Sequence, residues 1–264
     1  MEGIFNRMEY KYKLDRTMME HISTALRPHM VADAYSQGDD GFYVVNNLYL
    51  DTEDFWFIRN SLDRPPYKEK MRLRCYGDIV AGTQSPVYFE IKKKFMKSGN
   101  KRRIVLPTDL IDAWITKGEI PDAPTVNQQI VREIDVILQA YRPVPRLAVF
   151  YDRRAFFSKE LGSTLRVTFD YHIRYRMTDV DFVHGHGGRL VYPQDDYIME
   201  VKFKGGAMPQ WFANLLAEHD LAREPFSKVG KAWRQESWLL RHAEAEAPYG
   251  EYDSPCAIPL LAAN

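Results

Sequence analysis

Between residues 67 and 103 the sequence places basic side chains at every second position of short segments. In the first segment Lys70, Arg72 and Arg74 are separated by single apolar residues. Successive side chains of a β-strand point to opposite sides of the sheet, so these three cations share one face. Like charges held this close repel one another unless water or an anion relieves them. The whole region holds 11 Lys and Arg against 3 Asp and Glu, although the complete chain is neutral.

Glutamate accompanies the basic residues at a fixed spacing. A glutamate, any residue and a lysine occur together three times: Glu9 and Lys11, Glu90 and Lys92, Glu200 and Lys202. The i, i+2 spacing places each carboxylate beside an ammonium group on the same face of a strand. A few carboxylates among many cations could hold a divalent cation that bridges phosphate groups.

The remaining chain alternates between similar strands and amphipathic helices. The period-2 pattern predicts strands over residues 5–14, 42–52, 70–75, 88–94, 101–107, 147–157, 165–174 and 199–204, with a turn over 97–100. Apolar residues at helical spacing predict helices over 15–27, 55–62, 108–141, 211–221 and 228–243, with prolines dividing the long one. No internal repeat or domain boundary is found, so residues 1–245 are expected to form one domain and residues 246–264 a mobile tail.

Composition excludes several classes of protein. The chain has 264 residues, 45% of them hydrophobic and 27% charged, which is typical of a globular domain. A net charge of zero argues against a nucleic-acid or membrane-surface binder. Two cysteines, Cys75 and Cys256, indicate neither a disulfide scaffold nor a metal cluster. The first residues are too polar for a signal peptide and no run of about 18 apolar residues occurs, so we expect a cytoplasmic protein.

The repeated charged faces allow two arrangements of the sheet. In the first, a meander packs on helices and turns its charged face to water, as is common for single strands. In the second, the sheet closes with the charged faces inward and the apolar faces outward under helices. We favour the second, because a face turned only to water would also be rich in Ser, Thr, Asn and Gln. A cationic lumen implies a polyanionic ligand, most simply a chain of phosphates. A membrane barrel of the porin type would share the pattern, but the long amphipathic helices count against it.

A set of short motifs resembles a known family. The segment from Arg7 to Tyr12 is similar to the R-x-E-x-K-Y signature of the vacuolar transporter chaperone (VTC) polyphosphate-polymerase domain, in the triphosphate tunnel metalloenzyme (CYTH-like) superfamily. The resemblance continues in matching order through residues 48–52, 70–74, 89–92, 151–153, 166–170, 199–202 and 226–228. Each motif is weak alone, whereas the ordered set over about residues 5–235 is specific.

The resemblance implies an α+β fold, with a closed antiparallel tunnel of eight strands and helices packed outside. It also implies transfer of the γ-phosphoryl group of ATP, or of another nucleoside triphosphate, onto inorganic polyphosphate with Mn²⁺ or Mg²⁺. The phosphate ligands that it assigns are Lys11, Arg72, Arg74, Lys92, Arg153, Arg166, Lys202 and Lys228, with Arg7, Lys13, Lys70 and Lys94 as further candidates. Glu200 is the implied metal ligand. Glu9 and Glu90 are further metal candidates, and ion pairs with Lys11 or Lys92 are the alternative for them.

One departure bears on the activity. The wider superfamily usually opens with E-x-E-x-K, whereas this chain has Arg7 in place of the first glutamate. The change removes a metal-ligand candidate and adds a phosphate ligand, which favours a polymerase. A tripolyphosphatase in the same tunnel and a non-catalytic module that binds polyphosphate or nucleotide are the competing hypotheses. The base of the nucleotide, and whether a membrane-protein partner receives the product, are left open by the sequence.

Overall fold

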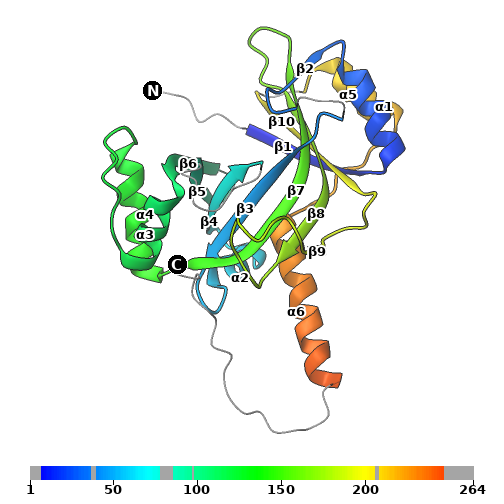
Figure 1. The fold of residues 1–264 in the computed structure, drawn as a ribbon. Helices are drawn as coiled ribbons and strands as arrows, with labels where there is room; N and C mark the ends of the chain where they lie inside the picture. The colour runs from blue at the N-terminus through cyan, green and yellow to red at the C-terminus, as the bar shows by residue number, and fades with distance from the viewer. Residues whose placement is uncertain (1–6, 37–39, 78–85, 97, 206–207, 247–264) are drawn as a thin grey trace.

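The computed structural model describes residues 7–36, 40–77, 86–96, 98–205 and 208–246 (Figure 1). The predicted tail therefore lies almost entirely outside the described residues. The strands are β1 (Arg7–Leu14), β2 (Met30–Ala32), β3 (Tyr43–Asp51), β4 (Tyr67–Tyr76), β5 (Pro86–Phe95), β6 (Ser98–Pro107), β7 (Val144–Ser158), β8 (Arg166–Arg176), β9 (Arg189–Leu190) and β10 (Tyr197–Lys204). The helices are α1 (Arg16–Leu26), α2 (Trp56–Leu62), α3 (Thr108–Lys117), α4 (Gln128–Tyr141), α5 (Gln210–Glu218) and α6 (Lys228–Glu246).

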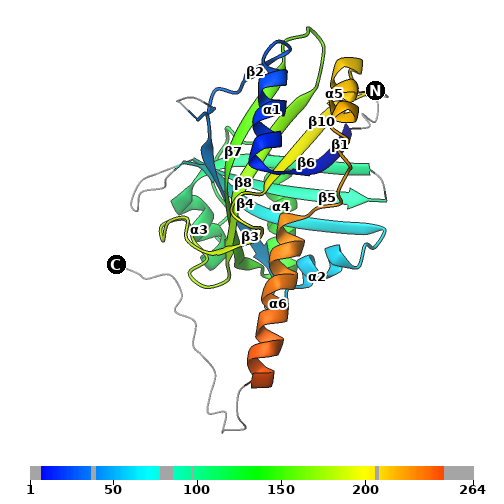
Figure 2. The same cartoon turned by 90° about the vertical axis from the view of Figure 1, so that its right-hand side faces the viewer.

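All ten strands belong to one antiparallel sheet. Its main path runs β1-β10-β8-β7-β3-β4-β5-β6, while β2 pairs with β7 and β9 with β8. The expected α+β architecture is confirmed, but eight-stranded closure is not. Within the described residues no ladder joins the two end strands, β1 and β6, so hydrogen bonds leave the sheet open. The sheet is nevertheless strongly twisted, and β4–β6 cross the direction of β7 and β8 at a steep angle (Figure 2).

Helices cover the outer, apolar face of the sheet as the alternation predicts. Helices α3 and α4 pack on β4–β6, where Met71, Phe89 and Trp114 belong to one fully buried cluster. Helices α1 and α5 pack on β1, β10 and β8 around a second cluster that contains Ile22 and Phe212. Burying these faces removes apolar surface from water, which is the main favourable contribution to folding.

Helix α6 packs against the opposite, concave face at one end of the sheet, where it meets α2, whose Phe57 also reaches the outer core. Val229 and Ala232 of α6 contact a cluster that includes Ile58 of α2 and Val149 of β7. The helix projects from that end of the molecule (Figures 1 and 2). Its first residue, Lys228, is thereby brought to the concave face.

The helix boundaries follow from local chemistry. Asp15 caps α1 by accepting a hydrogen bond from the Met18 amide at 2.7 Å, as its position in the sequence predicts. Asn127 caps α4 in the same way. The predicted division of residues 108–141 by prolines is confirmed, since α3 ends before Pro121 and α4 begins after Pro124.

Two local predictions differ from the structure. Residues 98–100, predicted as part of a turn, begin β6, because they pair with residues 93–95 of β5. The short strand β2 was not predicted, because three residues are too few to show alternation.

Cys75 is buried in the outer core, where burial raises the pKa of its thiol to about 12.

None of the helices in the part of the chain that the structure describes is long and apolar enough to cross a membrane.

Candidate functional site

The predicted cations of the first and last strands meet on the concave face of the sheet. Strand register places Lys11 of β1 opposite Glu200 of β10, and Glu9 opposite Lys202. On the other side of β10, Arg166 of β8 lies opposite Lys202. Because the side chains of register partners lie on the same face, residues far apart in the sequence share one surface.

Glu200 is the centre of this surface. Its carboxylate lies 2.6 Å from the Lys202 ammonium, 3.2 Å from Lys228, 3.6 Å from Lys11 and 3.9 Å from the Arg153 guanidinium. The Glu200 side chain is only 8% exposed. The predicted pairing of Glu200 with Lys202 is confirmed, and so is that of Glu9 with Lys11, at 3.2 Å.

Asp170 of β8 is a second buried carboxylate in the same cluster. It is fully buried and accepts two hydrogen bonds from Arg153, at 2.6 and 2.7 Å. The Lys228 ammonium lies 2.6 Å from Asp170 and 3.2 Å from Glu200, so it bridges the two acids. The bidentate pair fixes the guanidinium in one orientation. No role was predicted for Asp170, although it ends the Arg166-x-Thr-x-Asp170 motif.

The segment that precedes α6 connects Lys228 to the first strand. The Glu224 amide donates a hydrogen bond to the Lys11 carbonyl at 2.9 Å. The Lys11 ammonium in turn donates to the Phe226 carbonyl at 2.9 Å. These contacts position the ammonium groups of Lys11 and Lys228 around Glu200.

The acids of this cluster are ionised at neutral pH. Burial opposes their charge, but the surrounding cations outweigh it: Lys202, Lys228 and Lys11 hold the pKa of Glu200 well below its usual range. Burial likewise opposes the charge of Asp170, while Arg153 and Lys228 lower its pKa. A carboxylate with so low a pKa is a poor general base and a good ligand for cations.

A second cluster surrounds Glu90 on β5. Its carboxylate contacts Arg72 at 2.5 Å on one side and Lys101 on the other. Burial opposes this charge too, yet Arg72, Arg74 and Lys101 lower the pKa of Glu90 to about 2. The predicted pairing of Glu90 with Lys92 is therefore wrong. In the register Arg72 lies directly opposite Glu90, whereas Lys92 lies opposite Lys70 and Lys101.

Tyr151 connects the two clusters, and it is the main residue that the sequence did not single out. Its hydroxyl accepts a hydrogen bond from Arg74 at 3.0 Å, while Asn47 accepts another from Arg74 at 2.9 Å. The Lys228 ammonium lies 4.7 Å from the centre of the Tyr151 ring, and Arg153 at 5.1 Å. The only signal in the sequence is its place in the Tyr151-x-Arg153 motif.

Beyond Glu90 a row of lysines continues along the concave face. Lys92 of β5 lies between Lys70 of β4 and Lys101 of β6 in the register of the three strands. Burial together with the charge of Lys92 lowers the pKa of Lys70 to about 8. Partial desolvation by the surrounding strands, together with the charges of Lys202 and Lys11, also lowers the pKa of the solvent-accessible Lys92, an effect that Glu9 of β1 opposes. The curvature of the sheet thus brings charges of the first strand near those of β5.

The remaining predicted residues lie around these clusters. Arg166 contacts Asp33 at 3.5 Å, Lys13 contacts Asp196 at 2.8 Å near α6, and Lys94 is exposed opposite Lys68. The backbone of Arg7 pairs with Lys204, while its side chain lies outside what the structure describes. The basic run at residues 101–103 is divided between the two faces of the sheet, with Lys101 and Arg103 on the concave face beside Glu90 and Tyr88. Arg102 points to the outer face and contacts Glu133 of α4 at 3.4 Å.

The carboxylates fit a divalent cation that is shared with phosphate. Within the described ranges no group of three or more His, Cys, Asp or Glu side chains could hold a metal ion by itself. Glu9 and Glu200, however, both contact Lys11 and Lys202, so their carboxylates lie side by side. Mg²⁺ is commonly held by one or two carboxylates together with substrate phosphates. Glu90 lies apart from this pair, in ion pairs with Arg72 and Lys101 rather than with the predicted Lys92.

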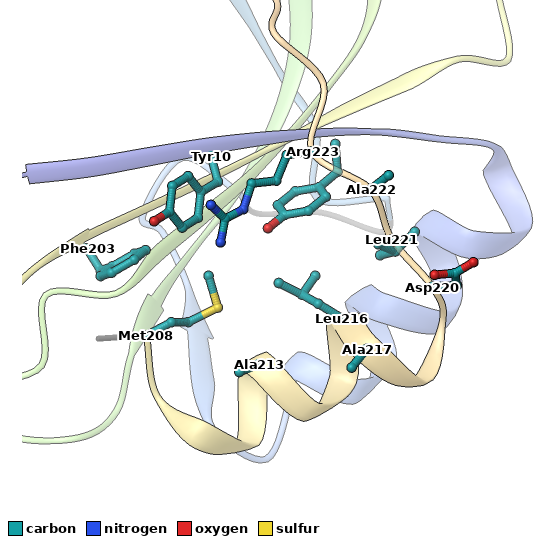
Figure 3. Close-up of a pocket in the computed structure, with 11 residues that line it drawn as sticks. Tyr10, Phe203, Met208, Ala213, Leu216, Ala217, Asp220, Leu221, Ala222 and Arg223 are labelled. Carbon is teal, nitrogen blue, oxygen red and sulfur yellow. The ribbon is translucent and has the colours of Figure 1, made fainter. Parts of the chain in front are cut away.

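A separate pocket lies behind β1, on its outer face (Figure 3). Its volume is about 410 Å³, and Tyr10, Tyr12, Leu216 and Arg223 contribute to its wall. The Arg223 guanidinium lies 3.5 Å from the centre of the Tyr10 ring. Since Tyr10 and Tyr12 alternate with Glu9 and Lys11, the pocket faces away from the charged clusters and is not part of the candidate site.

One comparison with known proteins assigns the chain to a family. The family model described as VTC domain matches residues 6–235. A search of curated proteins found no match. Among solved structures, a candidate adenylate cyclase from Bacillus halodurans is 12% identical with a TM-score of 0.47, over 84% of this chain and 95% of the other. That similarity is too distant to support a conclusion about function.

Proposed function

The chain belongs to the VTC domain family, and on that premise we propose that it is a polyphosphate polymerase. It transfers the γ-phosphoryl group of ATP to the end of an inorganic polyphosphate chain. The observation that carries the proposal is the continuous basic track on the concave face. From Lys11 and Lys228 around Glu200, it continues past Arg72 to Lys70 and Lys92 on β4 and β5.

The chemistry of the reaction suits this set of residues. A terminal oxygen of the acceptor chain attacks the γ-phosphorus, the bond to the β-phosphate oxygen breaks, and ADP leaves. The loose transition state of phosphoryl transfer needs positioning and charge neutralisation more than a strong base. An acceptor phosphate is already anionic, so the low pKa of Glu200 is no obstacle.

Individual residues have distinct roles in the proposal. Arg153, fixed by Asp170, and Arg74, fixed by Asn47 and Tyr151, present oriented guanidinium groups to phosphate oxygens. Lys11, Lys202 and Lys228 supply point charges, which polyphosphate can compete for against Glu200. Glu200 and Glu9 would hold Mn²⁺ or Mg²⁺, which when bound neutralises charge on the phosphates.

The test is incubation of the purified protein with ATP, Mn²⁺ and a short polyphosphate primer. Polymer is measured on a gel and orthophosphate in solution. We expect ADP to form with most of the transferred phosphate recovered as polymer, and a shorter lag with primer. Release of nearly all the phosphate as orthophosphate would favour the tripolyphosphatase, and binding without turnover would favour the binding module. Co-purification from cells would test whether a membrane-protein partner receives the product.

A further inference from the structure

A cluster of tyrosines closes one end of the concave face. Tyr76 ends β4 and Tyr88 lies near the start of β5, while Tyr43 begins β3 and Tyr35 precedes it in the chain. By strand alternation Tyr76 continues the face of Arg72 and Arg74, and Tyr88 lies opposite Arg74. The tyrosines therefore extend the phosphate-binding row rather than the outer core.

The rings contact one another closely. Tyr35 stacks on Tyr76 with ring centres 5.2 Å apart and an angle of 24° between the planes. Tyr88 meets Tyr76 edge to face at 5.7 Å, and Tyr43 meets it at 6.0 Å. Tyr35 also meets Tyr43 at 5.5 Å, yet it remains 55% exposed, which leaves ring surface accessible to a further planar group.

Cations adjoin the rings on the side of the phosphate row. The Arg103 guanidinium lies 5.0 Å from the centre of the Tyr88 ring, and Arg74 lies 6.0 Å from that of Tyr76. A ligand that stacked on Tyr35 could therefore continue directly into a phosphate chain. That combination, a planar apolar group joined to phosphates, describes a nucleoside triphosphate.

The opposite end of the same strands presents lysines instead of tyrosines on the concave face. There the concave positions are Lys70 and Lys92, followed by Lys68 and Lys94. Inorganic polyphosphate has no aromatic face and gains nothing from exposed rings, whereas it is attracted by a row of ammonium groups. Aromatic stacking, in contrast, binds every nucleobase.

We propose that Tyr35, with Tyr76 and Tyr88, forms the platform on which the base of the nucleoside triphosphate stacks. The concave face then has a direction: the nucleotide enters at the tyrosine end and the polymer leaves at the lysine end. This inference rests on the proposed function for its substrate, since it takes the ligand to be a nucleotide.

The experiment compares two ligands that differ in the nucleoside. Equilibrium binding of a non-hydrolysable ATP analogue and of tripolyphosphate is measured by calorimetry for Tyr35→Ala. We expect binding of the analogue to weaken roughly 5- to 150-fold, the loss typical of one base-stacking contact, with tripolyphosphate unchanged. Tyr35→Phe, which keeps the ring, should bind both ligands like the wild type.

Tyr67→Ala is the matched control, because Tyr67 is 42% exposed but lies on the outer face beside Glu69. It should change neither affinity. Equal weakening of both ligands in Tyr35→Ala, no weakening of either, or no binding of the analogue to the wild type would overturn the proposal. Because no turnover is involved, selective loss of the analogue supports the platform even if polymer synthesis is not found.

Discussion

Replacement of Glu200 by glutamine should uncouple stability, phosphate binding and turnover. The substitution keeps the size of the side chain and removes the charge at the centre of the first cluster. The cations around it then have only Asp170 and Glu9 as the main carboxylates that balance their charge. These cations are Lys11, Lys202, Lys228 and Arg153. Removing one partner of a buried ion pair costs about 3–5 kcal/mol, and the 8% exposure of Glu200 leaves little screening by water.

This loss should lower the melting temperature of the ligand-free protein by about 6–20 °C, since 1 kcal/mol corresponds to roughly 2–4 °C at this chain length. Tripolyphosphate should restore much of the difference, because it binds only the folded state and replaces the missing negative charge. Turnover of ATP should nevertheless fall by at least about 100-fold, as expected for the loss of a metal contact worth several kcal/mol.

The assays are thermal unfolding with and without tripolyphosphate and a gel assay of polymer formed with Mn²⁺. Glu218→Gln is the control, because Glu218 is exposed on α5 and belongs to no ion pair that the structure records; it should behave like the wild type. Near-normal turnover of Glu200→Gln would refute Glu200 as the metal ligand. An unchanged melting temperature without ligand would refute the electrostatic account of the cluster.

Three further predictions follow from the same geometry. The double variant Arg72→Ala and Arg74→Ala should lose most of the thermal stabilisation by tripolyphosphate. Arg223→Ala, which removes a cation outside the concave face, should keep it, and equal responses would mean that the basic face does not bind phosphate. The pKa of Glu90, about 2, lies below the pKa of a glutamate in the unfolded chain. The ionised Glu90 therefore contributes fully to stability above pH 5 and loses this contribution as pH falls toward 2, so Glu90→Gln should flatten that part of an acid-unfolding curve. Because the pKa of Lys70 is about 8, its ammonium group loses its charge as pH rises from 7 to 9, and the affinity for tripolyphosphate should fall. The fall should be smaller in Lys70→Arg, which stays charged, and identical pH profiles of the two proteins in calorimetry would contradict this.

Local pattern was enough to predict the faces of the strands. A period of two separates Met71 and Leu73 from Arg72 and Arg74 whatever the rest of the chain does, so the buried outer core and the charged concave face follow from the sequence. Ion pairs at i, i+2 on one strand are local in the same sense, and two of the three predicted pairs are confirmed. The family motifs likewise placed most of the cations on the face where they are found.

Which charges meet across strands depends on long-range pairing that no local pattern encodes. Glu90 pairs with Arg72 and Lys101, not with Lys92, because register between strands is set by pairing over long sequence separations. Lys228 reaches Asp170 and Glu200 only because α6 packs against the concave face. The twist of the sheet brings Glu9 near Lys92, although the end strands stay unpaired within the described residues. This twist is a property of all the strands together, and no single segment encodes it.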